Sequence, residues 1–148
     1  VINLNNGQGE TKNKVWIYDP HTPKKTISDR AKVRVQSACN QFLEKYLRPR
    51  FVCSFSAKNK KEPQCIDIGW KQRGNFIYFK AIYKDMRRNA MLEEYDYPLA
   101  RLEYMDTNLF NLAYFRHTGE WWTITHGRGN SLSECLDLIQ KLPHFKVV

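Results

Sequence analysis

No apolar run in this 148-residue sequence approaches the roughly 20 residues that a membrane-spanning helix needs. The first residues also lack the apolar core of a secretory leader. Internal repeats and low-complexity segments are absent as well. The chain begins with Val1 rather than Met, so we expect a trimmed chain or a piece of a longer protein. These absences favour a cytoplasmic protein that contacts no membrane and carries no metal or other cofactor.

Cys-x-x-Cys spacing, which is typical of zinc and redox sites, is absent from the four cysteines of the chain. Cys39 and Cys135 fall on the apolar stripes of expected helices, where a free cysteine packs as a small hydrophobic residue. We therefore expect buried free thiols and a reducing compartment, with disulfides or a metal site as less favoured alternatives. The four positions are Cys39, Cys53, Cys65 and Cys135.

Acidic residues are outnumbered, and the imbalance is concentrated in one part of the chain. The whole chain has a net charge of +9. Residues 24–90 contain 17 Lys and Arg against five Asp and Glu, a net charge of +12, whereas residues 91–148 have a net charge of −3. A basic region of this kind predicts a polyanionic partner, because each neutralised phosphate releases counterions. There are two alternatives: the charge only aids solubility, or the partner is an acidic protein.

The hydrophobic pattern predicts helix, hairpin, meander and helix. Ser28 caps a first helix, which should end near Leu47 because Pro49 follows. A capping box at Ser131 and Glu134 begins the last helix. The strands between them are expected at residues 65–70, 76–83, 99–105, 109–116 and 120–125.

These elements predict an α+β fold in which an N-terminal and a C-terminal helix pack on one antiparallel sheet. The sheet consists of a hairpin and a three-stranded meander. We expect a flexible N-terminal segment over residues 1–13 and a single domain over residues 14–148. A subdomain boundary, if there is one, would fall in the polar connection of residues 84–97.

Basic residues in loops and at a hairpin are the predicted nucleic-acid contacts, with a solvated surface as the alternative. Lys60 and Arg87 lie in two loops that should meet at one end of the same hairpin. Trp121 and Trp122 must face opposite sides of their strand, so one of them is free to stack on a base or to pack under a helix. The predicted contacts are Lys58, Lys60, Lys61, Lys71, Arg73, Lys84, Arg87 and Arg88.

A second candidate site surrounds the turn at residues 117–119. His117 and Glu120 can act as general base and partner, and Arg116 can stabilise a phosphate, with His126 further along the chain. This set suits RNA cleavage without a metal. The structural alternative is an ordinary hairpin in which Arg116 pairs with Glu120 across the strands.

The chain resembles a domain of unknown function found in small bacterial proteins. The resemblance is carried by the segments at residues 99–104, 110–122, 131–136 and 143–145, and most specifically by the Arg-His-Thr-Gly-x-Trp run at 116–121. It extends over about residues 19–145. The resemblance implies a free-standing bacterial domain, and it supplies no catalytic residues because the family has no established activity.

A weaker likeness links the expected architecture to small ribonucleases of the RelE-toxin and barnase type, without a shared motif. Our first hypothesis is therefore a non-enzymatic domain that binds nucleic acid or another polyanion through residues 24–90. A metal-independent ribonuclease is the second hypothesis. A protein–protein interaction module is the third. The sequence leaves the oligomeric state open.

Overall fold

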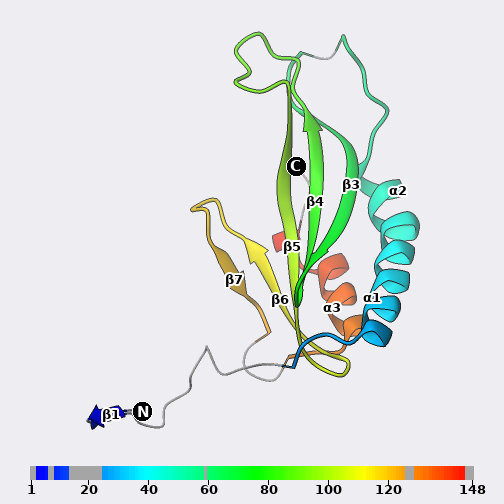
Figure 1. Ribbon diagram of the computed structural model, residues 1–148. Coiled ribbons are helices and arrows are strands. Elements are labelled where there is room, and N and C mark those ends of the chain that lie inside the picture. The colour runs from blue at the N-terminus through cyan, green and yellow to red at the C-terminus, as the bar shows by residue number, and fades with distance from the viewer. Residues whose placement is uncertain (1–2, 7–8, 14–24, 59, 126–128, 146–148) are drawn as a thin grey trace.

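The computed structural model describes residues 3–6, 9–13, 25–58, 60–125 and 129–145. Its main element is a five-stranded antiparallel sheet in which each strand pairs with the next one along the chain. The predicted α+β fold with a hairpin and a meander is confirmed (Figure 1). The strands are β3 (Gln64–Arg73), β4 (Phe76–Lys84), β5 (Glu94–Asp106), β6 (Leu109–Phe115) and β7 (Trp121–Thr123).

The helices lie on one face of this sheet (Figure 1). Helix α1 (Asp29–Phe42) continues through a π-helical turn, η1 (Leu43–Leu47), into α2 (Arg48–Phe51). The predicted end near Leu47 is therefore wrong. Pro49 lies in the first turn of α2, where its missing N–H and fixed φ are tolerated. The wider turn before it lets the N–H of Arg48 donate to Leu43 O, five residues back.

Helix α3 (Leu132–Lys141) begins at the predicted capping box and is followed by a 3-10 turn, η2 (Pro143–Phe145). The Ser131 hydroxyl accepts from the N–H of Glu134, and the Glu134 carboxylate accepts from the N–H of Ser131. At the first helix, Ser28 Oγ accepts from the N–H of Ala31 in the predicted cap. The side chain of Asn75, in the β3–β4 turn, holds the chain before α1 through bonds with Ile27 N and Lys25 O.

The core lies between the sheet and the helices. Strand β4 is an interior strand whose side chains alternate between the two sides of the sheet, and Ile77, Phe79 and Ala81 are buried against the helices. Cys39 and Cys135 are fully buried in the same cluster. All four cysteines are free thiols. Three are buried as expected, whereas Cys53 is exposed in the connection after α2.

Two β-bulges change which residues face the helices. In β3 the pairing passes from Cys65 to Asp67, so Ile66 is the extra residue, and Cys65 and Ile68 are both buried. In a regular strand Cys65 and Ile68 would face opposite sides of the sheet, and the bulge puts both on the helix side. In β5 the pairing passes from Pro98 to Ala100, so Leu99 is the extra residue. A bulge reverses the inward and outward positions of the residues before it.

Strand β5 begins at Glu94 rather than at the predicted Leu99 and pairs with β4 along its length. Residues 94–97 of the expected polar connection therefore belong to β5. Within the N-terminal segment, β1 (Asn3–Asn6) and β2 (Gly9–Asn13) form a separate antiparallel pair that the sequence pattern did not predict. No helix of the described residues is long and apolar enough to cross a membrane.

Candidate nucleic-acid interface

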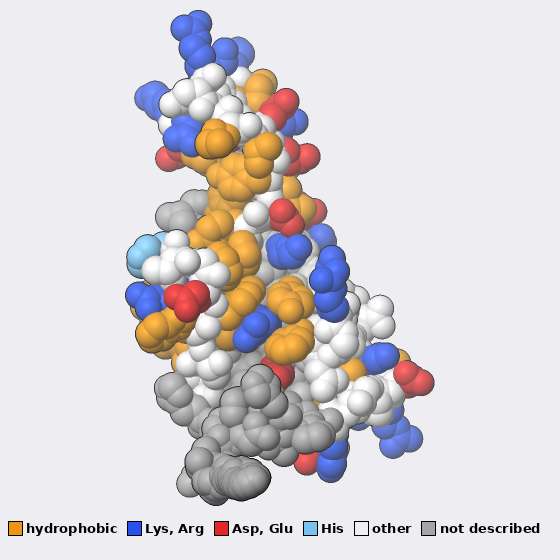
Figure 2. All heavy atoms as spheres, turned by 60° about the vertical axis from the view of Figure 1, so that its left-hand side comes forward, with side chains coloured by type: hydrophobic (Ala, Val, Ile, Leu, Met, Phe, Trp, Pro, Cys, Tyr) orange, Lys and Arg blue, Asp and Glu red, His pale blue; other side chains and the backbone are white. Residues whose placement is uncertain are grey.

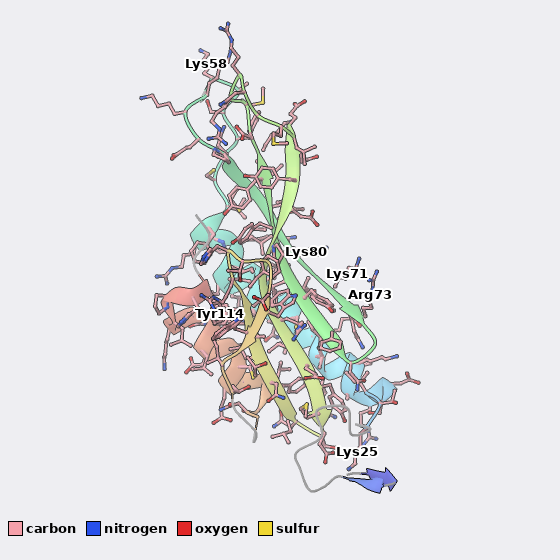
Figure 3. The ribbon with its side chains drawn as sticks, turned by 90° about the vertical axis from the view of Figure 1, so that its left-hand side faces the viewer. Lys25, Lys58, Lys71, Arg73, Lys80 and Tyr114 are labelled. Atoms are coloured by element: carbon pink, nitrogen blue, oxygen red, sulfur yellow. The ribbon has the colours of Figure 1, made fainter. Side chains whose placement is uncertain are left out.

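We call the side of the five-stranded sheet that faces away from the helices the open face. Figures 2 and 3 show this side of the molecule, and Figure 2 shows hydrophobic side chains gathered on it with Lys and Arg beside them. Strand alternation places Phe76, Tyr78 and Lys80 there, because their neighbours Ile77 and Phe79 point into the core. The sheet register adds the residues that pair with these positions on β3 and β5.

Four aromatic side chains from three strands form a cluster on the open face. The ring centres of Tyr78 and Trp121 are 6.0 Å apart, although β5 and β6 lie between their strands. Ala113 occupies the intervening position on β6 and has a side chain small enough to leave room for the indole. The aromatic cluster consists of Phe76, Tyr78, Phe115 and Trp121, all half-buried.

Arg101 lies within the aromatic cluster. Its guanidinium carbon is 4.9 Å from the centre of the Phe76 ring and 5.0 Å from the centre of the Trp121 ring. These are cation–π distances. Arg101 Nε is buried and has no hydrogen-bond partner among the described residues. The open face therefore carries a cation that is held by aromatic rings and has no carboxylate partner in the described part of the chain.

Two of the predicted contacts, Lys71 and Arg73, are exposed on the open face beside this cluster. Lys71 pairs in register with Tyr78, and Arg73 with Phe76. Neither forms an ion pair within the described residues. Figure 3 shows both side chains projecting from the same end of β3, with Lys80 further along the sheet. Lys71 and Arg73 thus supply free positive charge next to stacking surfaces.

The other predicted contacts lie at the far end of the β3–β5 strands, which we call the distal tip. The connections at residues 52–58, 60–63 and 85–93 come together there (Figure 1), as expected for Lys60 and Arg87. Figure 3 labels Lys58 at this end. The distal-tip residues are Lys58, Lys60, Lys61, Lys84, Arg87 and Arg88.

Some of the basic side chains at the distal tip already make contacts within the protein. The guanidinium of Arg87 donates to both oxygens of Asp85, and this pairing lowers the pKa of the Asp85 carboxyl. The Lys84 ammonium lies 4.9 Å from the centre of the Phe55 ring. Met91, next to these residues, is 98% exposed. The tip is therefore a mixed surface of cations and apolar side chains.

Residues 24–90 do not form one basic face. Several of their cations lie on α1, on the side opposite the open face, and others are neutralised by carboxylates. Arg48 pairs with Glu44 and Asp67, and Lys80 pairs with Asp96. Lys25, on the segment before α1, pairs with Asp106 at 2.9 Å. The charge asymmetry of the sequence therefore overstates the free positive charge on any one surface.

The residues of the predicted ribonuclease site surround the β6–β7 turn. The turn is closed by Gly119 N–H donating to Arg116 O, with Gly119 at a φ of 90°. Arg116 lies 4.2 Å over the Trp122 ring, and the expected Arg116–Glu120 ion pair does not form. Glu120 instead accepts from the Thr118 hydroxyl.

His117 and Glu120 are both exposed, and no hydrogen bond joins their side chains in the described part of the chain. His126 lies outside the described residues. No group of three or more metal-ligating side chains occurs among the residues that the structure describes. The turn therefore holds three of the four proposed groups near one another without pairing the base with its partner.

The two tryptophans face opposite sides of β7, as predicted. Trp121 joins the aromatic cluster on the open face, whereas Trp122 pairs with Tyr114 on the helix side and is 48% exposed. Trp70 packs on the helix side of the sheet, and its indole N–H donates to Asn40 of α1. Packing therefore accounts for Trp70.

Sequence reasoning missed Arg101, Phe115 and the Lys80–Asp96 pair as parts of the surface. Arg101 carries a weak signal, because a single charge between the apolar residues Ala100 and Leu102 must face away from the core. Asp96 has no comparable signal, since its side depends on the bulge at Leu99.

No curated protein and no solved structure shows significant similarity to this chain. A comparison with protein families matches residues 22–146 to the family described as domain of unknown function DUF3024. The matched range covers the five-stranded sheet and all three helices. It confirms the resemblance carried by the Arg-His-Thr-Gly-x-Trp run and by the capped C-terminal helix. The chain therefore belongs to the DUF3024 family of domains of unknown function.

Proposed function

We propose that the protein binds single-stranded nucleic acid on the open face of its sheet. The observation that carries the proposal is the contact of the Arg101 guanidinium with the rings of both Phe76 and Trp121 on that face. Aromatic rings and guanidinium planes are the surfaces on which unpaired bases stack.

A single strand fits this surface better than a duplex does. Proteins read the major groove of DNA with a helix or a two-stranded ribbon, and on the open face the described residues present a broad sheet. The bases of a single strand are exposed and can lie on half-buried rings such as Tyr78 and Trp121. The phosphates between those bases would meet Lys71 and Arg73, which are exposed and form no ion pair among the described residues.

The direct test is the binding of short fluorescent single-stranded RNA, single-stranded DNA and duplex DNA, measured by anisotropy. We expect both single strands to bind more tightly than the duplex. Affinity should fall several-fold or more between about 50 mM and about 200 mM salt, because phosphate contacts release counterions. Equal binding of duplex and single strands, or binding that ignores salt, contradicts the proposal.

A matched pair of double variants locates the surface. Lys71→Ala with Arg73→Ala removes two charges from the open face, and Lys58→Ala with Lys60→Ala removes two from the distal tip. We expect the first variant to weaken binding and to reduce the salt slope by about one for each lost phosphate contact. The second should bind nearly as the wild type does. The reverse result would move the interface to the distal tip.

A further inference from the structure

A shallow pocket lies on the open face next to the aromatic cluster, between β3, β4 and β5. Its volume is about 450 Å³. A pocket of this size is within the usual range for small-ligand sites, and a single nucleobase fits in it. The side chains that matter for what it binds are Lys71, Lys80, Ile82 and Asp96, around the bare backbone of Gly69.

Gly69 keeps this pocket open. It pairs in register with Lys80, so a side chain at position 69 would project from the open face into the pocket. No atom lies within 4 Å of the place where a Cβ would stand. The glycine has no positive φ that would require it. Backbone conformation therefore does not require a glycine at position 69. We attribute the glycine to the pocket, which a side chain at this position would fill.

An ion pair forms one wall of the pocket. Lys80 Nζ lies 3.1 Å from Asp96 Oδ2. The hydrogen bond from Lys80 is the largest cause that lowers the pKa of the Asp96 carboxyl, which therefore stays ionised at neutral pH. An ionised carboxylate accepts about four hydrogen bonds, so Asp96 has acceptor capacity beyond the one bond from Lys80. The wall thus offers hydrogen-bond donors and acceptors side by side.

The charges around the pocket are balanced. Lys71 and Lys80 stand opposite Glu94 and Asp96. A bare phosphate would be repelled by the two carboxylates, so the pocket is poorly suited to the backbone of a nucleic acid. A neutral group with its own donors and acceptors fits this pattern, and a nucleobase is such a group.

We propose that this pocket binds a guanine base of the single strand, an inference that rests on the proposed function of the open face. Guanine presents two neighbouring donors, N1–H and N2–H, and the acceptor O6 on one edge. The two donors match the Asp96 carboxylate, and O6 matches the Lys80 ammonium. Ile82 would contact the face of the ring from the floor of the pocket.

The other bases make fewer of these bonds. Adenine and cytosine each offer one amino group next to a ring acceptor, which would face the carboxylate unfavourably. Uracil offers a single N–H between two acceptors. Only guanine gives the carboxylate two donors at once. A bidentate pair of this kind discriminates against a wrong base by about tenfold or more.

The experiment uses the full chain and uridine-rich RNA strands that carry one variable base at the centre. The central base is guanine, inosine, adenine, cytosine or uridine. We expect guanine to bind about tenfold more tightly than uridine, and inosine to lose most of that gain because it lacks the N2 amino group. Asp96→Asn should remove the preference for guanine, so that the guanine-containing and all-uridine strands bind this variant equally.

A second variant tests the pocket independently, in case Asp96→Asn disturbs the fold. Gly69→Val fills the pocket at a position with free space and ordinary strand geometry. We expect this variant to fold, by circular dichroism, and to bind guanine-containing and all-uridine strands equally. Lys141→Ala, on helix α3, is the control and should keep the wild-type preference.

The outcomes separate the two proposals. Equal affinity for all five strands, with binding still sensitive to Lys71→Ala and Arg73→Ala, overturns the guanine site and leaves the open-face interface standing. A guanine preference that survives both Asp96→Asn and Gly69→Val also overturns it. Failure of every strand to bind the wild type overturns both proposals.

Discussion

The guanidinium of Arg101 lies 5.0 Å from the ring of Trp121, although a whole strand separates β5 from β7. The contact is possible because Ala113 stands between them on β6 and carries only a methyl group. It joins the last and shortest strand of the sheet to the central one. The same contact builds the aromatic surface on which the proposed function depends.

The neighbouring tryptophans provide a matched pair of variants for this surface. Trp121→Ala should weaken single-strand binding about tenfold or more, since stacking of one base contributes about 1–3 kcal/mol. Trp122→Ala should bind nearly as the wild type does, because that ring lies on the helix side of the sheet. Fluorescence anisotropy measures both, and thermal unfolding checks that each variant is folded. Equal losses would place the binding site elsewhere.

Two glycines should respond oppositely to alanine. At Gly129 the φ is 73°, and an added Cβ would stand 2.8 Å from Phe110 O, so Gly129→Ala should lower the free energy of unfolding by about 1–3 kcal/mol. Gly69→Ala should raise it by about 0.5–1 kcal/mol, since a glycine within a strand is unfavourable and the space is free. Urea unfolding measures both changes. An unchanged free energy of unfolding in Gly129→Ala would show that the turn before α3 is not constrained as described.

Thiol reactivity should distinguish Cys53 from the other three cysteines. Burial raises the pKa of the Cys39 and Cys135 thiols to about 12 and that of Cys65 to about 11. Reaction with a thiol reagent at pH 8 should therefore modify Cys53 quickly and the others only after unfolding. Mass spectrometry of the labelled protein counts the modified sites, and fast labelling of three or four cysteines in the native protein contradicts the burial.

The stability of the protein should fall in acid because several carboxyl groups have lowered pKa values in the folded state. Asp85 and Asp106 accept hydrogen bonds from Arg87 and Lys25, which hold their pKa below the ordinary value of 3.8. Their contribution is complete above that value and is lost as the pH falls through the folded-state pKa. Asp85→Asn should therefore flatten the acid limb of a plot of unfolding free energy against pH. An unchanged limb would show that this pair contributes nothing.

The ribonuclease hypothesis has its own test at the β6–β7 turn. We expect labelled RNA to stay intact when it is incubated with the wild type in the presence of a chelator, because His117 and Glu120 are not hydrogen-bonded to each other. His117→Ala is the comparison. Degradation by the wild type that disappears in this variant would establish metal-independent cleavage and would falsify the non-enzymatic hypothesis.

The order of the elements was predictable because each has a local cause. The capping box at Ser131, the alternation of β4 and the glycine turn at 119 all act within a few residues of the chain. The side of the sheet on which a residue falls was less predictable. Cys65 and Asp96 changed sides because of the bulges at Ile66 and Leu99, and a bulge has no fixed residue pattern.

The candidate surface was predictable only in part for the same reason. Lys71 and Arg73 were named from charge, and Trp121 from its aromatic character. Arg101 was missed because its partners come from strands that are far apart in the sequence. The continuous helix through Pro49 was missed because a π-helical turn depends on hydrogen bonds that no local sequence motif predicts.

The bulge at Leu99 determines which residues in the first half of β5 face the open side of the sheet. With the extra residue, the even-numbered positions Glu94 and Asp96 point to the open face, although the odd-numbered Arg101 does so further along the same strand. If Leu99 instead paired in register with Lys80, Tyr95 and Tyr97 would take the open face in place of those carboxylates. The pairing of one residue thus decides whether this end of the surface is acidic or aromatic.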